Sequence, residues 1–248
     1  MKQREAVVQV LERHWWYARL STLRDELIWN PIFVTNAKEP FANIRRIVQR
    51  TPKEIYIIRP WLYWLVKERK RLEQLWLEQI TQKNKDDPAI QKQSHSYYQW
   101  LLVDIWNLKH FLTYVPHQDQ NKVCFSDKWM HLKDIITENN LEWLIKMIKR
   151  TETIDVIRLN DDNKLPSNVF EVEHSTNIIN SLNKFAELKG LSAWCYIVAD
   201  ESRHKEFDKN ASLTVYKDIN PKFLSYENLE NYYDKITEYY SLKKLTWF

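Results

Sequence analysis

The stretch VFEVEHSTNIINSLNKFAEL, residues 169–188, constrains the fold of this chain more than any other feature. It begins with an apolar strand pattern and continues at once into an amphipathic helix pattern. The strand part carries Glu171 and Glu173, and side chains two positions apart on a strand point to the same side. A strand with a packed side, two carboxylates on one face and a helix directly after it predicts a sheet flanked by helices, with an acidic site at one end of that sheet.

The hydrophobic pattern predicts two groups of elements, which gives a mixed fold of the α+β or α/β class. The first group has three helices and then two short strands: 3–13, 20–28, 40–50, 55–58 and 62–66. The second group runs helix, strand, strand, strand, helix, strand, and then a last strand and a C-terminal helix: 95–109, 111–116, 153–159, 169–174, 175–189, 193–200, 222–225 and 226–241. Ser175 or Thr176 is the expected N-cap of the helix after the glutamate strand. We expect domains over 1–70 and 94–248, joined by a helical linker over 71–93.

Composition indicates a globular protein outside the membrane. The 248 residues are 44% hydrophobic and 28% charged, and no run of about 18 apolar residues would span a bilayer. The N-terminal stretch MKQREAVVQVLERH has no apolar signal core. Cys124 and Cys195 lack metal-ligand spacing and predict buried thiols in a reducing compartment. We therefore expect a cytoplasmic protein without a membrane partner.

Positive charge is concentrated at the front of the chain. The net charge is only +4, but residues 1–75 hold 15 Lys or Arg against 8 Asp or Glu. Arg45, Arg46 and Arg50 lie in or next to the third expected helix and project away from its apolar face. A basic front joined to a slightly acidic remainder predicts contact with a polyanion, while a merely solvated basic surface is the alternative.

A third carboxylate lies near the glutamate pair. Asp155 belongs to the β-branched run TIDVIRL, which we expect to pair with residues 169–174 as a hairpin. Carboxylates gathered at one end of a sheet repel one another unless a cation or protons neutralise them. Oxygen ligands without His or Cys favour Mg²⁺ or Mn²⁺. An E-x-E pair also occurs on the solvated face of antiparallel sheets, and the residues alone leave that alternative open.

Residues 5–67 resemble the winged-helix domains that are fused to restriction enzymes and chromatin proteins. The stretches AVVQVLERH, PFANIRRIVQ and IIRPWLYWLV carry this resemblance through their apolar spacing. In that family the third helix reads DNA, which implies DNA contacts for Arg45, Arg46 and Arg50. The alternative is a core helix with solvated arginines.

Residues 95–230 resemble the PD-(D/E)xK nuclease superfamily, to which most type II restriction endonucleases belong. The matching stretches are TIDVI, VFEVEHSTNIINSLNKFAEL and YIVADESRHKEF. The resemblance implies a small mixed sheet flanked by helices, with Asp155 and Glu171 as metal ligands. The third motif position, usually Lys, is Glu173 here, so the activation of the water needs another account. The first helix of the family often adds an acidic residue, for which Asp104 is the candidate.

The function that this resemblance implies is a Mg²⁺-dependent endonuclease that hydrolyses phosphodiester bonds in double-stranded DNA, as type II restriction enzymes do. Asp155, Glu171 and Glu173 are the catalytic candidates. Lys184, on the helix after the acidic strand, is a candidate phosphate contact, with a solvated lysine as the alternative. A homodimer and a cognate DNA methyltransferase would fit such an enzyme. Two other functions stay open: a non-catalytic DNA-binding regulator built on a decayed nuclease domain, and a repair nuclease.

Glycine is unusually rare in this chain and tryptophan is unusually common. There is 1 glycine against 12 tryptophans, whereas about 17 glycines are expected at average usage. Trp15, Trp16, Trp61 and Trp106 lie where turns are expected, which glycine would suit better. We hypothesise that some of these tryptophans are glycines in the native protein, through a reassigned UGA codon. Peptide sequencing of the native protein tests this, and tryptophan at these positions would end the hypothesis.

Overall fold

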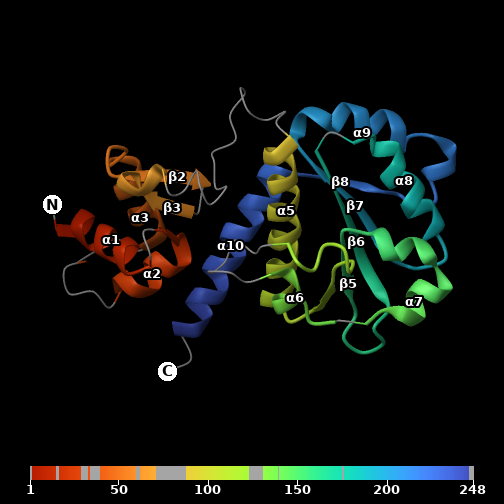
Figure 1. Ribbon diagram of the computed structural model, residues 1–248, viewed down its shortest axis with the longest axis horizontal. Coiled ribbons are helices and arrows are strands. Elements are labelled where there is room, and N and C mark those ends of the chain that lie inside the picture. The colour runs from red at the N-terminus through yellow and green to blue at the C-terminus, as the bar shows by residue number, and fades with distance from the viewer. Residues whose placement is uncertain are drawn as a thin grey trace. The chain divides into compact units, whose positions relative to one another are not determined.

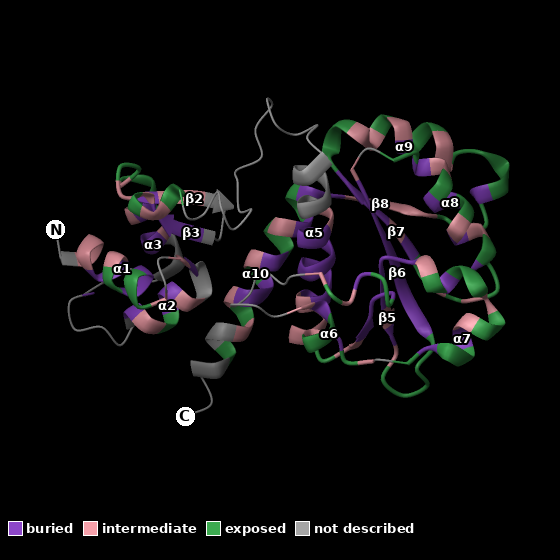
Figure 2. Ribbon diagram, viewed as in Figure 1, coloured by how far each residue is buried: buried purple, intermediate pink, exposed green. Residues whose placement is uncertain are grey.

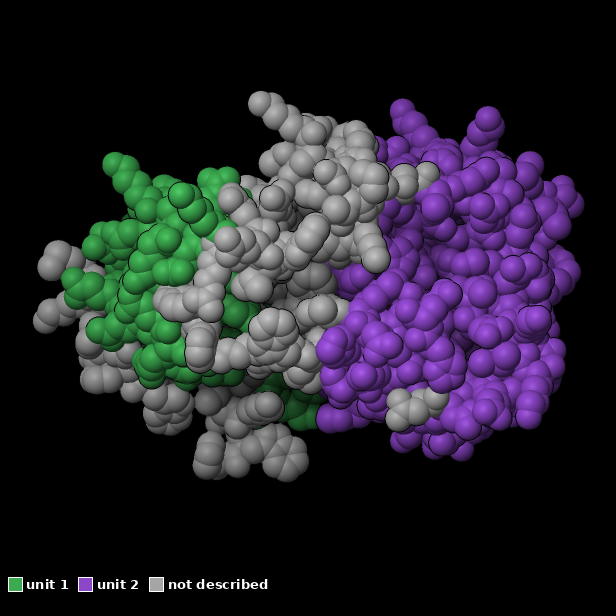
Figure 3. All heavy atoms as spheres, viewed as in Figure 1, with its two compact units in different colours: residues 1–85, 234–248 green, residues 86–233 purple. Residues whose placement is uncertain are grey.

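The computed structural model describes residues 2–14, 17–28, 33, 40–59, 62–70, 88–122, 131–138, 140–174 and 176–245. The chain divides into two compact units, shown in Figure 3, which are residues 1–85 with 234–248, and residues 86–233. Each unit has its own sheet, one of three strands and one of five. The units are therefore described one at a time.

The first unit contains the basic front of the chain. Its elements are α1 (Lys2–Arg13), β1 (Tyr17–Arg19), α2 (Leu20–Ile28), α3 (Pro40–Gln49), β2 (Ile55–Arg59) and β3 (Leu62–Leu65). The strands form an antiparallel sheet in the order β1-β3-β2. The three expected helices and the hairpin are confirmed. Strand β1 was not expected, because three residues are too short to show an alternating pattern.

The second unit contains the acidic strand. Its elements are α5 (Pro88–Leu108), β4 (Leu112–Tyr114), α6 (Leu132–Ile135), α7 (Glu142–Met147), β5 (Val156–Leu159), β6 (Pro166–Glu173), α8 (Ile178–Glu187), β7 (Trp194–Ala199), α9 (His204–Ala211), β8 (Lys222–Ser225) and the first turns of α10 (Tyr226–Leu245). Figure 1 shows the sheet between α5 on one side and α7, α8 and α9 on the other. The eight expected elements are present in the expected order, and the short helices α6, α7 and α9 lie between them.

The five-stranded sheet is mixed, as expected for the α+β class. Its order is β4-β5-β6-β7-β8, with antiparallel pairing from β4 to β6 and parallel pairing from β6 to β8. The expected hairpin forms between β5 and β6, where Val156 lies opposite Phe170. Strand β5 begins one residue after Asp155, so this carboxylate sits at the entrance of the strand rather than within it. That register brings Asp155 next to Glu171.

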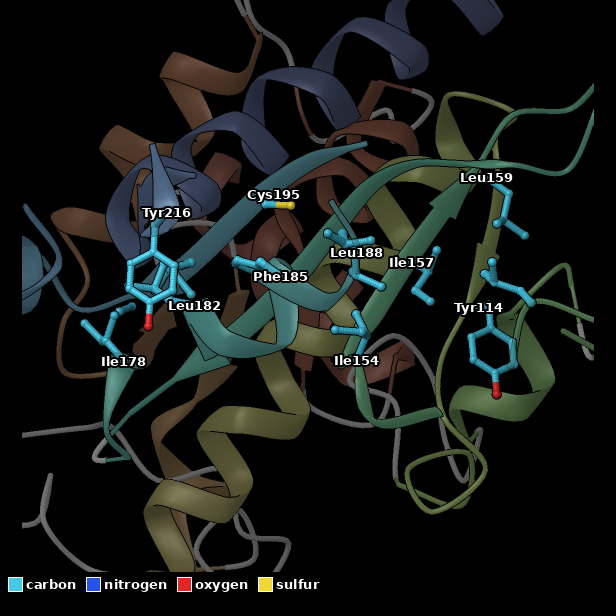
Figure 4. Close-up of a cluster of buried hydrophobic side chains, with 14 of the residues drawn as sticks. Tyr114, Ile154, Ile157, Leu159, Ile178, Leu182, Phe185, Leu188, Cys195 and Tyr216 are labelled. Atoms are coloured by element: carbon cyan, nitrogen blue, oxygen red, sulfur yellow. The ribbon is translucent and has the colours of Figure 1, made fainter. Parts of the chain in front are cut away.

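Strand β6 lies at the centre of the sheet and is buried along its whole length (Figure 2). Val169 belongs to the same hydrophobic core as Ile178, Leu182 and Phe185 of α8, and Figure 4 shows these three side chains of α8 in the core. Glu171 and Glu173 share a face with Val169, because side chains alternate along a strand. Both glutamates therefore point toward the layer formed by α8, and the solvated-face alternative is wrong.

The start of α8 differs from the expectation. The helix begins at Ile178, and its N-cap is Asn177, whose side-chain oxygen accepts a hydrogen bond from the Ile179 backbone N–H. Thr176 is not the cap, because its hydroxyl donates to the carboxylate of Glu173. Ser175 lies outside the described residues.

Of the four tryptophans in the glycine hypothesis, the structure describes Trp106. Trp15, Trp16 and Trp61 lie outside the described residues. Trp106 has ordinary helical backbone in α5, and its ring packs against Phe111. The left-handed residue at the following turn is His110, with φ of 62°. The expectation that Trp106 occupies a position suited to glycine is therefore wrong.

Two further expectations concern the cysteines and the membrane. Cys195 is a buried free thiol, and burial raises its pKa to about 12. Cys124 lies outside the described residues. Among the described helices, none combines the length and the apolar character needed to span a bilayer.

Candidate active site

Asp155 and Glu171 lie side by side at one end of the central hairpin. Both are almost fully buried, with 8% and 2% of their surface exposed. The Asp155 carboxylate accepts a hydrogen bond of 2.8 Å from the Val172 backbone N–H. On its other side it contacts the imidazole Nε2 of His95, on α5, at 3.1 Å. A backbone N–H of β6 and a side chain of α5 thus hold this carboxylate.

Lys184 completes the site from α8. Its Nζ donates to the Glu171 Oε2 at 2.7 Å and to the Thr153 backbone oxygen at 2.9 Å. Ser181, one turn earlier on the same helix face, contacts the carboxylates of both Glu171 and Glu173. The alternative of a solvated lysine is wrong, because only 23% of the Lys184 side chain is exposed and its ammonium pairs with a buried glutamate.

Glu173 lies in a separate set of contacts at the end of β6. It accepts hydrogen bonds from the hydroxyls of Ser181 and Thr176. The guanidinium of Arg203 is 4.0 Å from its Oε2 and also donates to the Thr176 backbone oxygen at 2.6 Å. Ser181 has one hydroxyl hydrogen, so it cannot donate to Glu171 and Glu173 at once. A proton on one of the two carboxylates would satisfy the second contact.

The three carboxylates differ in acidity because their partners differ. Burial and the charge of Asp155 raise the pKa of Glu171 well above its ordinary value, against the opposing effect of Lys184. Burial also raises the pKa of Glu173, although the hydrogen bond from Ser181 opposes this. Burial acts on Asp155 in the same direction, but His95, the Val172 N–H and Lys184 outweigh it and lower the pKa. Asp155 is therefore the ionised member of the cluster, and Glu171 binds a proton more readily.

The site presents carboxylate oxygens, which are the kind of donor that a hard divalent cation prefers. The Glu171 Oε1 is buried and has no hydrogen-bond partner among the described residues, which leaves a lone pair directed into the protein. Carboxylate oxygens are the ligands that Mg²⁺ and Mn²⁺ prefer. In the described part of the chain, no three His, Cys, Asp or Glu side chains already form a metal-binding group. The Lys184 ammonium instead pairs with Glu171, and the His95 Nε2 contacts Asp155.

The remaining site residues predicted from the sequence lie elsewhere. The Asp104 carboxylate accepts a hydrogen bond of 2.6 Å from the Tyr233 hydroxyl. In the first unit, Arg46 and Arg50 are exposed. The guanidinium of Arg45 is half-buried in an ion pair with Asp234. Arg46 and Arg50 are thus exposed, whereas Arg45 is engaged in an ion pair.

Comparison with known proteins identifies the family. Residues 76–246 match the family described as the type II restriction enzyme NmeDI C-terminal domain. The chain belongs to this family. A 134-residue stretch is 28% identical to the type II restriction enzyme NmeDI of Neisseria meningitidis serogroup C, covering 50% of this chain and 37% of that enzyme. The chain thus spans well under half the length of this relative. No solved structure matches it.

The NmeDI C-terminal family region includes three site residues that the sequence pattern did not indicate, His95, Gln99 and Ser181, and a fourth, Lys184, that it indicated only as a phosphate contact. His95 and Gln99 lie four residues apart on α5 and both contact Asp155. Ser181 and Lys184 lie three residues apart on α8 and both contact Glu171. Residues three or four apart lie on one face of a helix. Polar residues at this spacing, on the helices that flank the acidic strand, are therefore the sequence pattern that indicates these contacts.

The acidity of Glu171 leads to a prediction about stability. The pKa of Glu171 is higher in the folded protein than in the unfolded chain. As the pH rises above the pKa of the unfolded chain, the free energy of unfolding therefore falls, because ionisation is less favourable in the folded protein. We expect Glu171→Gln, which removes this cost, to raise the melting temperature by a few degrees at pH 7–8 in the presence of EDTA. The advantage should shrink as the pH falls through the unfolded-state pKa and vanish well below it, where wild-type Glu171 is protonated in both states. Thermal unfolding followed by circular dichroism measures it, and a lower melting temperature of the variant at pH 8 would contradict the assignment.

Proposed function

We propose that this chain is a Mg²⁺-dependent DNA endonuclease of the restriction type, with a PD-(D/E)xK-like site. The observation that carries the proposal is the convergence of Asp155, Glu171 and Lys184 at one end of the β5–β6 hairpin. Membership of the NmeDI C-terminal family supports it. Two carboxylates and a lysine meet the chemical needs of phosphodiester hydrolysis, which are a cation site and a positive group near the reacting phosphate.

In this proposal each residue has a role set by its contacts. Asp155 and Glu171 would hold Mg²⁺, with Mn²⁺ as a substitute. A bound divalent ion lowers the pKa of its water and stabilises charge that develops on the phosphate. Lys184 orients the attacking water and adds positive charge beside it, so that a helix residue takes the place of the motif lysine that is absent at position 173. Glu173 aligns Ser181 and through it the Glu171 carboxylate.

The first unit would dock the enzyme on double-stranded DNA as a winged helix. Three helices with a three-stranded antiparallel sheet support this, as does the exposure of Arg46 and Arg50 on α3. We expect that Arg46→Ala and Arg50→Ala each weaken DNA binding and lower the slope of log Kobs against log salt concentration by about 1. Fluorescence anisotropy at several salt concentrations measures the slope. Lys146→Ala, which alters an exposed lysine on α7, is the control, and an unchanged slope in both arginine variants would contradict the docking role.

A cleavage assay tests the proposed activity against its alternatives. Supercoiled plasmid should be cut in Mg²⁺ or Mn²⁺ and left intact in EDTA, with discrete fragments from a linear substrate. Metal-independent DNA binding without any cleavage would favour the regulator built on a decayed nuclease domain. Preference for RNA or for free ends would favour a repair nuclease. Discrete fragments that disappear after treatment with a cognate methyltransferase would identify restriction, and light scattering would show whether the active form is a homodimer.

A further inference from the structure

Beside the carboxylate pair lies a polar cluster formed by Lys122, Asp119, Gln99 and His95. The Lys122 Nζ contacts the Asp119 Oδ1 at 2.7 Å, the Gln99 Oε1 at 2.9 Å and the His95 Nδ1 at 3.3 Å. Gln99 is fully buried, and only 8% of the Asp119 side chain and 20% of the Lys122 side chain are exposed. An ammonium group has three hydrogens to donate, and here three acceptors surround it. Lys122 is therefore committed to its neighbours and has no hydrogen left for a phosphate.

Lys122 also determines how its neighbours face Asp155. An ammonium only donates, so the His95 Nδ1 accepts from it and the ring hydrogen is on Nε2. That Nε2–H then donates to the Asp155 Oδ2 at 3.1 Å. In the same way the Gln99 oxygen faces Lys122, which directs its NH₂ group to the Asp119 Oδ2 at 2.6 Å and the Asp155 backbone oxygen at 3.2 Å. One cation thus sets the tautomer of His95 and the orientation of the Gln99 amide.

Asp155 depends on such support because of its place in the chain. Asp155 precedes β5, so the backbone hydrogen bonds between that strand and its neighbours do not hold it in place. Its contact from β6 is the Val172 backbone N–H. If Lys122 were absent, the ring hydrogen of His95 could move to Nδ1, and a lone pair on Nε2 would then face the carboxylate. The orientation of a metal-binding carboxylate by such outer partners is a general determinant of metal affinity.

We propose that Lys122 is a positioning residue for Asp155, acting through the fixed tautomer of His95 and the fixed amide of Gln99. The inference rests on the proposed function, because it assigns Asp155 as a ligand of the divalent ion. It goes beyond that function in identifying a lysine outside the acidic motif, in the segment after β4, on which the metal site depends.

The test is Mn²⁺ titration of the full chain by calorimetry, with three kinds of variant. Lys122→Met should weaken Mn²⁺ binding about 10- to 100-fold, the range for lost outer partners of metal ligands, and Lys122→Arg should recover part of it. His95→Gln, whose amide NH₂ can replace Nε2–H, should bind Mn²⁺ more tightly than His95→Asn, which is too short to reach. Lys133→Met is the matched control, since Lys133 is an exposed lysine that contacts Asn121 near the same segment. It should bind Mn²⁺ as the wild type does.

A metal-free measurement addresses the tautomer directly. In ¹⁵N-labelled protein in EDTA, the His95 ring should show the Nε2–H form in the wild type and a mixture of forms in Lys122→Met. Wild-type Mn²⁺ affinity in folded Lys122→Met would overturn the inference while leaving the proposed function intact. If Lys122→Met does not fold, equal Mn²⁺ affinities of His95→Gln and His95→Asn would overturn it instead. A wild-type protein that neither binds Mn²⁺ nor cuts DNA would remove both the inference and the proposed function.

Discussion

Glu171→Gln is expected to lower the rate of metal-dependent DNA cleavage by at least about 10³-fold, although the variant protein should be more stable without metal. The substitution keeps the size of the side chain and its contact with Lys184, but it removes the negative charge that would bind the divalent ion. Metal-assisted stabilisation of the transition state contributes several kcal/mol, and about 4 kcal/mol corresponds to 10³ in rate. Single-turnover cleavage of a defined duplex at saturating Mg²⁺ measures the effect.

The control for this variant is Glu187→Gln. Glu187 lies at the end of α8, with 48% of its side chain exposed, and pairs with Arg150 rather than with the site. Its cleavage rate should match that of the wild type. If Glu171→Gln retained more than about a tenth of the wild-type rate, metal binding through Glu171 would be excluded.

Lys184→Met is expected to reduce the cleavage rate about 10²- to 10³-fold while leaving DNA affinity nearly unchanged. The Lys184 ammonium is 2.7 Å from Glu171 and would add positive charge where the transition state develops negative charge, and the loss of one such group has an effect of this size. Lys184→Arg should recover part of the rate, since it retains the charge with a different shape. Burst kinetics together with anisotropy separate the chemical step from binding.

Two further variants sharpen the test of Lys184. Lys189→Met removes an exposed lysine that follows α8 and pairs with Asp218, and it should leave the rate unchanged. Glu173→Gln should cost less than Lys184→Met, because Ser181 and Thr176 can still contact the new amide. A larger loss in Glu173→Gln than in Lys184→Met would show that the residue at motif position 173, rather than the helix lysine, activates the water.

The placement of the carboxylates can be predicted from the sequence, because simple rules of strand geometry apply to them. Alternation placed Glu171 and Glu173 on one face, and the polar turn between two β-branched runs predicted the hairpin that brings Asp155 to Glu171. Each rule depends on neighbouring residues alone.

The partners of these carboxylates were harder to predict because they depend on how helices pack. The sequence pattern indicates a phosphate contact for Lys184, because it does not show how α8 is rotated against the sheet. Resemblance and charge indicate Asp104 on α5, whereas the helix presents His95 and Gln99 to Asp155. Gln99 and Asp104 are five residues apart, about 7.5 Å along the helix axis, and which turn meets the strand is decided by tertiary packing.

The central claim is that Asp155 and Glu171 together bind the divalent ion of a DNA-cleaving site, and diffraction from crystals soaked in Mn²⁺ tests it most directly. The account predicts an anomalous difference peak at coordination distance from a carboxylate oxygen of each residue, and no peak in Glu171→Gln crystals treated identically. A wild-type protein that cuts DNA with Mn²⁺, yet shows its anomalous peak away from Asp155 and Glu171, would contradict the account.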